Sequence, residues 1–135
     1  MPMTGAAAPT ILLAEDDEVL RSTTARVLVK LGYQVVDTTD GVEALQAFEA
    51  NADAIGLVLS DVVMPRLDGL GLLQALRAMG RGVSVLLVSG RSEADLPAEL
   101  VDAAVRFLPK PWTVSDLARA VREAMALAPL AAEAA

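Results

Sequence analysis

Short runs of aliphatic residues recur along the chain and alternate with longer amphipathic segments. Five runs have the length and composition of buried β-strands: Thr10–Ala14, Tyr33–Val36, Leu57–Ser60, Val83–Val88 and Arg106–Leu108. Strands that alternate with helical segments are typical of βαβ units, in which a helix returns the chain to the start of the next parallel strand. The pattern therefore predicts an α/β fold built on one parallel sheet.

Four of the segments between and after these runs carry apolar residues at helical spacing. These residues are Leu20, Thr24, Val27, Leu28 and Leu31; then Val42, Leu45 and Phe48; then Leu70, Leu73, Leu76 and Met79; and finally Leu117, Val121, Ala124 and Met125. Gly32 supplies a stop for the first helix, and Asp40-Gly41-Val42-Glu43 predicts a capping box for the second. The last helix is expected to start at Thr113, with Asp116 at its third position.

The segment between the last two strands is less regular. Pro97 interrupts it, and proline is tolerated mainly at the first turn of a helix. We therefore expect a further helix that begins at or near Pro97, with Ser89–Leu96 as a loop. This gives five helices in all.

The 135 residues fit one domain, which we place at residues 10–128, with flexible tails at 1–9 and 129–135. Hydrophobic residues make up 54% of the chain but aromatic residues only 3%, so the core is expected to be aliphatic. No apolar run approaches the roughly 20 residues that cross a bilayer, and Met1–Pro9 lacks the features of a signal peptide. The expected location is the cytoplasm, without membrane attachment.

The chain contains no cysteine and no histidine. Disulfides, thiol catalysis, a phosphohistidine and imidazole-ligated zinc are therefore excluded, and any bound metal must be a hard cation with oxygen ligands. The net charge of −7 opposes direct binding to the phosphate backbone of nucleic acids.

Charged residues stand at the ends of three predicted strands. Glu15-Asp16-Asp17 follows the first, Asp61 follows the third, and Lys110 lies between two prolines after the fifth. Open α/β sheets bind ligands at the carboxyl ends of their strands. If the strands are parallel, carboxylates and one ammonium converge there, which predicts a site for Mg²⁺ and a phosphoryl group.

Further motifs join these charged residues at or near the predicted strand ends: the Met64-Pro65 and Asp68-Gly69 loop, Ser89-Gly90 and Phe107-Leu108-Pro109-Lys110-Pro111. Together with Glu15-Asp16 and Asp61 they carry a resemblance, from about Thr10 to Ala128, to the receiver domain of bacterial two-component response regulators. Each motif alone is common, but here five occur in the family's order at predicted strand ends. The resemblance implies a flavodoxin-like doubly wound fold with strand order 2-1-3-4-5.

The resemblance also implies roles for individual residues. Asp61 would be the phosphoacceptor, and Asp16, Asp61 and the backbone carbonyl of Val63 would bind Mg²⁺, with Glu15 acting mainly through water. Lys110 would pair with the phosphoryl group or with the free aspartate, and the Lys110–Pro111 bond would be cis. Ser89 would hydrogen-bond a phosphoryl oxygen, and Phe107 would be the aromatic residue that turns inward.

The partners implied are a histidine kinase or a histidine phosphotransfer protein as donor, and an unidentified protein target bound at the fourth helix, fifth strand and fifth helix. The resemblance implies no conventional enzyme, since such a domain catalyses only its own phosphorylation and dephosphorylation. Oligomeric state and cognate kinase stay open. So does the choice between a stand-alone receiver and one belonging to a hybrid histidine kinase or a larger regulator.

Two other functions compete with this one. A haloacid dehalogenase-type phosphatase also uses a nucleophilic Asp and Mg²⁺, but needs a second Asp where this chain has Val63. A pseudo-receiver would usually lack an acidic ligand or the lysine, and both are present. Singly, the same residues have ordinary structural readings: Glu15-Asp16 as a helix cap, Asp61 as a turn residue, Lys110 as a surface lysine and Phe107 as a core aromatic.

Overall fold

A parallel five-stranded sheet with the order β2-β1-β3-β4-β5 forms the centre of the molecule. The computed structural model describes residues 9–90 and 97–127. Its strands are β1 (Thr10–Ala14), β2 (Gln34–Thr38), β3 (Ile55–Asp61), β4 (Ser84–Ser89) and β5 (Val105–Pro109). Its α-helices are α1 (Glu18–Lys30), α2 (Gly41–Asn51), α3 (Gly69–Ala78) and α4 (Val114–Met125). The fold class and strand order predicted above are confirmed, and β1 has the predicted bounds.

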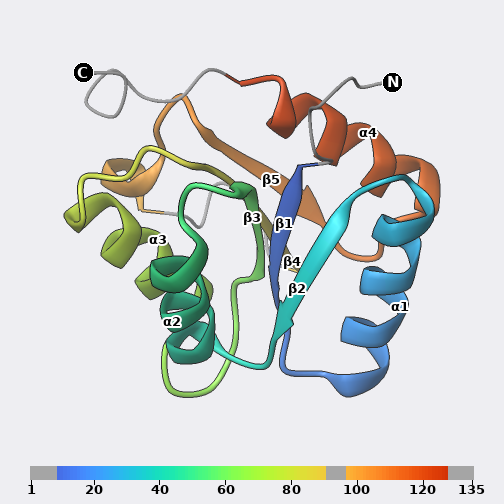
Figure 1. Ribbon diagram of the computed structural model, residues 1–135, viewed down its shortest axis with the longest axis horizontal. Helices are drawn as coiled ribbons and strands as arrows, with labels where there is room; N and C mark the ends of the chain where they lie inside the picture. The colour runs from blue at the N-terminus through green and yellow to red at the C-terminus, as the bar shows by residue number, and fades with distance from the viewer. Residues whose placement is uncertain (1–8, 91–96, 128–135) are drawn as a thin grey trace.

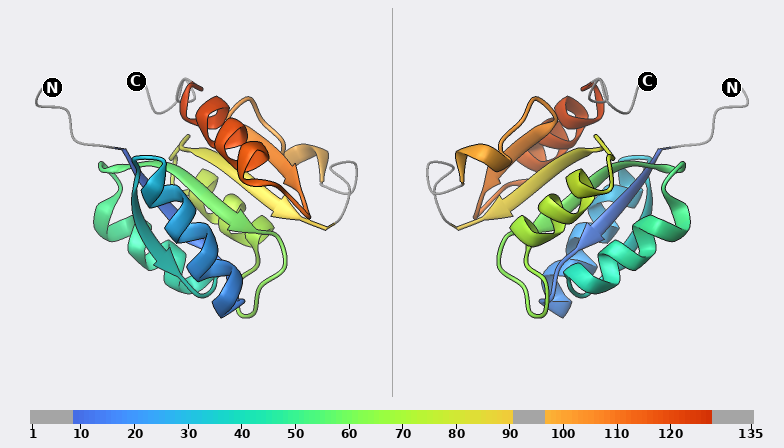
Figure 2. Two further views of the ribbon diagram at one scale, coloured as in Figure 1. Left: turned by 90° about the vertical axis from the view of Figure 1, so that its right-hand side faces the viewer. Right: turned by 90° about the vertical axis from the view of Figure 1, so that its left-hand side faces the viewer.

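The helices form two layers around the sheet. Helices α1 and α4 cover one face, and α2 and α3 cover the other (Figures 1 and 2). Because successive residues of a strand point to opposite faces, each strand contributes to both cores. In β1, Leu12 packs with the α2 and α3 side, and Ile11 and Leu13 with the α1 and α4 side. The central strands are therefore apolar almost throughout, as parallel strands buried on both faces require.

The helix expected from Pro97 is replaced by a single 3₁₀ turn, Ala98–Leu100. The described residues thus contain four α-helices rather than five. Pro97 does stand at the start of the turn, but β5 begins at Val105, which leaves too little chain for a helix of ordinary length and its connection. Asp102 then fixes the return to the sheet, because its carboxylate accepts hydrogen bonds from the Arg77 side chain and from the Ala104 N–H.

Two residues assigned to buried helix faces are exposed. Leu31 and Met79 are each 41% exposed, because each is the capping residue of its helix and lies beyond the face that packs on the sheet. The other apolar positions predicted for α1, α2, α3 and α4 are buried or partly buried. No described helix is long and apolar enough to cross a membrane.

The helix starts were partly predicted. Thr113 and Asp116 form the full capping box at the start of α4. At α2, Asp40 accepts a hydrogen bond from the Glu43 N–H, but the Glu43 carboxylate accepts from Thr39 N–H instead of from Asp40 N–H. The capping box predicted for α2 was therefore right about the Asp40 cap and wrong about the return hydrogen bond from the Asp40 N–H to the Glu43 carboxylate.

Several expectations fall on residues outside those described. The tail predicted at 129–135 and nearly all of that at 1–9 lie there, as do residues 91–96 of the predicted loop Ser89–Leu96. Pro9 is described, and its carbonyl accepts a hydrogen bond from the Gln34 N–H at the start of β2.

Candidate functional site

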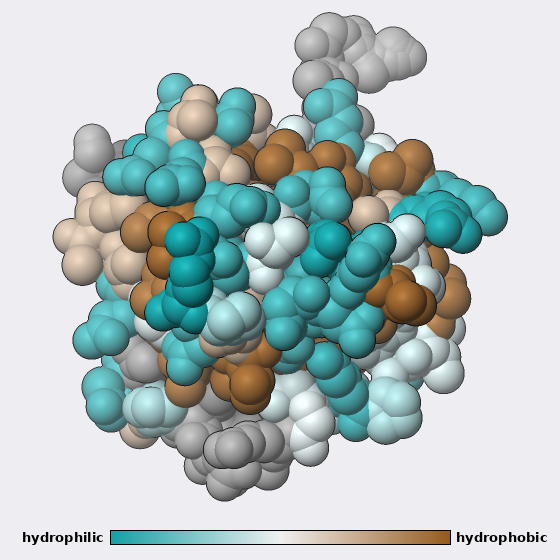
Figure 3. Space-filling model, turned by 90° about the horizontal axis from the view of Figure 1, so that it is seen from below, coloured by the Kyte–Doolittle hydropathy of each residue, from teal (hydrophilic) through white to brown (hydrophobic). Residues whose placement is uncertain are grey.

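The carboxyl ends of the central strands meet at one edge of the sheet. Ala14 at the end of β1 pairs with Ser60 of β3, Asp61 pairs with Val88 of β4, and Ser89 pairs with Pro109 of β5. The residues that follow these pairs therefore emerge side by side. Figure 3 views this end of the molecule, where hydrophilic residues occupy much of the middle and hydrophobic patches lie beside them.

Three carboxylates form a cluster at this edge. Glu15 and Asp16 follow β1, and Asp61 is the last residue of β3; each offers a carboxylate oxygen within 4.8 Å of those of the other two. Glu15 and Asp61 are buried, whereas Asp16 is exposed. Like charges held this close repel one another unless a cation lies among them. The cluster is therefore an electrostatically costly arrangement that a divalent cation would relieve.

Lys110 supplies the only described ammonium ion-paired to the cluster. Its Nζ lies 3.1 Å from Asp61 Oδ2 and 3.8 Å from Glu15 Oε1. The lysine follows β5 directly, and its N–H donates to the Ser89 carbonyl at 2.8 Å, which extends the β4–β5 ladder to the site. The Lys110–Pro111 bond is cis, as the resemblance implied. The chain therefore brings together the ammonium and the carboxylate that are 49 residues apart.

The environment of Glu15 changes its acidity. Burial, with the neighbouring charge of Asp61, raises the pKa of the Glu15 carboxyl from 4.5 to about 7, although the Asp17 N–H and the Lys110 ammonium act in the opposite direction. The Asp17 N–H donates to Glu15 Oε2 at 3.1 Å. A carboxyl that titrates near neutrality is characteristic of functional sites.

The loop after β3 is built around a close backbone approach at Gly69. The Gly69 N–H donates to the Val62 carbonyl at 2.8 Å, and a Cβ at Gly69 would overlap the Asp61 carbonyl oxygen. Val63 lies within this closed loop with its side chain 62% exposed. No described residue donates a hydrogen bond to the Val63 carbonyl, so the oxygen that the resemblance assigns to the metal has no competing partner among them.

The remaining two candidate residues lie on the neighbouring strands. Ser89 is the last residue of β4 and is buried, and its strand position places it beside Asp61 and Lys110 at the same edge. Phe107 is in the middle of β5, partly buried, and packs against the core on the α2 and α3 side. It is a partly buried core aromatic, and β4 separates its strand from β3, which carries Asp61.

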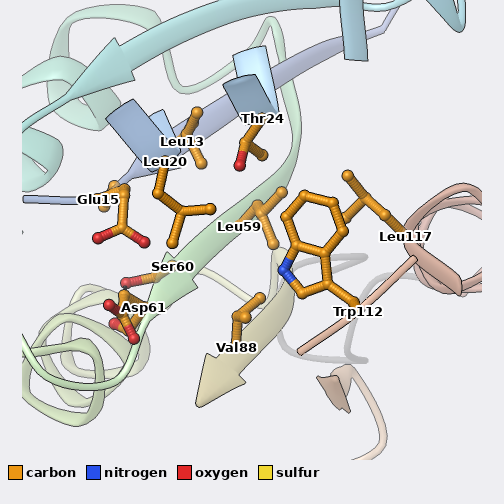
Figure 4. A pocket seen from close by; sticks show the side chains of 11 residues that line it. Leu13, Glu15, Leu20, Thr24, Leu59, Ser60, Asp61, Val88, Trp112 and Leu117 are labelled. Carbon is orange, nitrogen blue, oxygen red and sulfur yellow. Dashed lines mark hydrogen bonds between the residues drawn. The ribbon is translucent and has the colours of Figure 1, made fainter. Parts of the chain in front are cut away.

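A small cavity of about 10 Å³ lies behind the acidic cluster, which is room for one water molecule. Figure 4 shows the Trp112 ring beside Val88 and Leu117, with Glu15 and Asp61 on the opposite side of the cavity. Trp112 therefore packs beside the site, and its fluorescence is placed to report on it.

The sequence patterns did not identify Arg21, which shapes the loop after β1. Arg21 on α1 donates from its guanidinium to the Glu15 carbonyl at 2.9 Å and lies 3.6 Å from the Asp37 carboxylate of β2. It thus fixes the backbone from which the acidic side chains extend. Arg21 is one polar position on an amphipathic helix, and only the placement of β2 beside β1 shows what it contacts.

The donor set suits a hard cation. The cluster offers only carboxylate oxygens, with a backbone carbonyl close in sequence, and Mg²⁺ prefers oxygen ligands and retains several waters. Asp16 is exposed and so can present an oxygen to a partly hydrated ion. The residues present therefore fit Mg²⁺ better than a transition metal that prefers nitrogen or sulfur.

The chain is similar to known proteins in sequence and in fold. Residues 11–122 match the family model described as the response regulator receiver domain. The chain is 41% identical over 118 residues to the sensor kinase CckA of Brucella abortus, covering 84% of this chain and 12% of that protein. It is 38% identical over 121 residues to the transcriptional regulatory protein PrrA of Mycobacterium tuberculosis, covering 88% of this chain and 51% of that protein. The chain thus spans about half the length of one relative and much less of the other.

Solved structures share the fold. The receiver domain from hybrid histidine kinase CckA superposes with a TM-score of 0.73 at 38% identity, covering 86% of this chain and 98% of that domain. A response regulator receiver domain protein from Clostridium thermocellum superposes with a TM-score of 0.79 at 24% identity, covering 87% of this chain and 94% of that one. At that lower identity the second likeness concerns the fold alone.

Proposed function

Because the chain belongs to the response regulator receiver domain family, we propose that Asp61 is its phosphoacceptor, with Mg²⁺ bound beside it. Receiver domains are signalling modules, so the product of the reaction is a modified protein. The proposal extends to a single receiver unit at residues 10–128 that acts in the cytoplasm. The observation that carries it is the convergence of Asp61, Glu15 and Asp16 with the Lys110 ammonium at one edge.

The proposed reaction is a phosphoryl transfer from a phosphohistidine to Asp61. A carboxylate oxygen of Asp61 forms a bond to phosphorus as the phosphorus–nitrogen bond of a donor phosphohistidine breaks, and the imidazole nitrogen keeps the bonding electron pair. The printed sequence contains no histidine, so the donor phosphohistidine must lie outside these 135 residues. We propose a histidine kinase or a histidine phosphotransfer protein.

The chain's own residues lower the barrier by placement of charge. Lys110, now 3.1 Å from Asp61 Oδ2, is placed to pair with a phosphoryl oxygen once Asp61 carries the phosphoryl group. Bound Mg²⁺ would neutralise charge on the phosphoryl oxygens, and Asp16, Asp61 and the Val63 carbonyl would hold it, with Glu15 acting through water. Ser89 would donate its hydroxyl hydrogen to a phosphoryl oxygen, since it ends the strand beside Asp61.

The output follows from this added group. A covalent phosphoryl group with new contacts to Lys110 and Ser89 would bias an equilibrium between two conformations of the β4 and β5 ends. We propose that Phe107 responds by turning further inward, and that the surface of β5 and α4 then binds a protein target. The sequence predicted that this surface also includes a helix between β4 and β5. The described residues contain no α-helix there, so β5 and α4 are the described parts of the surface.

The surroundings of the cluster suit a protein donor. Three valines on elements that begin or end at this edge are strongly exposed: Val19 in the first turn of α1, Val63 after β3 and Val114 in the first turn of α4. Apolar side chains beside an acidic centre can be covered by a docking protein, which would also exclude water from the reacting carboxylate.

Neither competing function is favoured. The position where a haloacid dehalogenase-type phosphatase needs its second Asp holds Val63, which has no proton to donate. A pseudo-receiver is disfavoured because the acidic residues and the lysine are all present and close together.

The test is chemical modification followed by intact-mass measurement. Incubation with acetyl phosphate and Mg²⁺ is expected to add one phosphoryl group to the native chain and none to Asp61→Asn. Asp68→Asn, which alters an exposed carboxylate on the same loop, is expected to react like the native chain. Absence of the adduct on the native chain, or its persistence in Asp61→Asn, would overturn the assignment.

A further inference from the structure

The loop that connects β3 to α3 contains a strained turn at Arg66. The Leu67 N–H donates to the Pro65 carbonyl at 2.8 Å, which closes a three-residue turn, and Arg66 at its centre has φ of 67°. A γ-turn with positive φ is rare and strained, and residues other than glycine seldom adopt it. Such a conformation persists only where the surrounding structure holds it.

Arg66 is held by a carboxylate from a different part of the chain. Its Nε donates to Asp40 Oδ2 at 2.8 Å and a terminal guanidinium nitrogen donates to Asp40 Oδ1 at 3.3 Å. This two-point contact fixes orientation as well as distance. The Asp40 side chain is 10% exposed, and it also caps α2 by accepting from the Glu43 N–H at 2.8 Å, so its position is itself fixed.

A backbone contact beside this pair shows how closely the loop approaches α2. The Gly41 N–H donates to the Leu67 carbonyl at 2.9 Å, and a Cβ at Gly41 would overlap that carbonyl oxygen. The tip of the loop is therefore docked on the first turn of α2 by one backbone bond and one ion pair.

The base of the same loop is fixed at the sheet. The Val62 N–H donates to the Val88 carbonyl at 3.0 Å, and the Val62 carbonyl accepts from Gly69. Val63 and Met64 lie between this base and the docked tip, and the Met64 side chain is buried. The direction of the Val63 carbonyl thus depends on both anchors.

We propose that the Asp40–Arg66 ion pair is a positioning device that holds the loop after β3 so that the Val63 carbonyl faces the metal. The inference rests on the proposed function, because it assigns that carbonyl to Mg²⁺. Neither Asp40 nor Arg66 belongs to the carboxylate cluster, and both act through the loop. The Arg66 hydrogen bond, followed by that of the Glu43 N–H, holds the pKa of Asp40 below its usual value, so the pair is intact at neutral pH.

Calorimetric titration of Mg²⁺ into matched variants tests the proposal. Arg66→Gln removes the cation and keeps an unbranched side chain, and Asp40→Asn removes the anion and keeps a residue that caps helices well. Direct electrostatics predicts opposite effects, with tighter Mg²⁺ binding after loss of a cation and weaker binding after loss of an anion. The positioning role predicts weaker binding in both, by about tenfold, and a double variant no weaker than the single ones.

The control is a second ion pair of the same geometry. Arg77 contacts Asp102 at 2.8 and 3.4 Å, but it lies near the end of α3, away from the carboxyl edge of the sheet. Arg77→Gln is expected to leave the Mg²⁺ dissociation constant unchanged. If Arg66→Gln fails to fold, Arg66→Gly replaces it, since glycine adopts positive φ without strain and still lacks the guanidinium.

Hydrogen exchange in metal-free protein separates this inference from the proposed function. Amides of residues 63, 64 and 66–68 are expected to exchange faster in Arg66→Gln and Asp40→Asn than in the native chain, and at the native rate in Arg77→Gln. Native protein that binds no Mg²⁺ would overturn the proposed function. Unchanged exchange in both variants, or Mg²⁺ binding within twofold of native in both, would overturn the positioning role.

Discussion

Replacing Glu15 by glutamine should stabilise the metal-free protein at alkaline pH, although it removes a residue of the site. Burial, followed by the charge of Asp61, raises the pKa of Glu15 from 4.5 to about 7. Between these two values the folded state binds more protons than the unfolded state, so the free energy of unfolding falls as pH rises through this window. Above pH 7 the full cost of ionising the buried carboxyl is present.

The pKa change sets the size of the effect. An increase from 4.5 to about 7 corresponds to a loss of up to about 3 kcal/mol of stability at pH 8, relative to a side chain that does not ionise. Loss of the contact with Lys110, at 3.8 Å, makes the net gain of Glu15→Gln smaller. Near pH 4.5 the two proteins should be about equally stable, because both side chains are then largely neutral.

The assay is urea unfolding in EDTA at pH 5, 6, 7 and 8, followed by circular dichroism. Glu49→Gln, at an exposed position of α2, is the control and should track the native chain at every pH. Saturating Mg²⁺ should reverse the order, since a ligand that binds only the folded state stabilises the native site more. A variant less stable than native at pH 8 without metal, or a difference independent of pH, would refute the reasoning.

Two further substitutions probe the framework of the site, and a third probes an ion pair away from it. Lys110→Met leaves Asp61 without its ion pair and should reduce metal-free stability by about 1–3 kcal/mol in urea unfolding at pH 8; an unchanged midpoint would contradict the contact at 3.1 Å. Gly69→Ala should cost about 3 kcal/mol or more by the same assay, because a Cβ there overlaps the Asp61 carbonyl, and full native stability would contradict that approach. Burial raises the pKa of Asp102, but the hydrogen bonds from the Arg77 side chain and the Ala104 N–H, together with the Arg77 charge, outweigh it and the net pKa is lowered. The stability that this pair adds should therefore be present above pH 4 and lost as pH falls below it, so Asp102→Asn should flatten the acid limb of the unfolding curve.

The sheet and the site were predictable because the relevant signals are local. The run Thr10–Ala14 is apolar enough to identify a doubly buried strand, and charged residues directly after such runs must lie at the carboxyl edge. The positions of Glu15, Asp61 and Lys110 then follow from parallel pairing alone, with no knowledge of side-chain contacts.

Features that depend on tertiary contacts were not predictable. Arg66 and Asp40 are 26 residues apart in the sequence. Their pairing requires a strained turn at Arg66 that no residue pattern predicts. The segment after Pro97 was expected to form a helix. It forms a 3₁₀ turn instead, because the contact between Arg77 and Asp102 shortens the connection to β5. Leu31 continues the helical spacing of apolar residues, but it is the C-terminal capping residue of α1 and lies outside the packed face. Periodicity alone does not define where a helix ends.

The most direct test of the account is a crystal structure of the chain with Mg²⁺ and beryllofluoride. We expect the beryllofluoride on a carboxylate oxygen of Asp61, the ion among Asp16, Asp61 and the Val63 carbonyl, and Lys110 against a fluorine. A beryllofluoride on any other side chain, or an ion bound away from Asp16 and Asp61, would contradict the account.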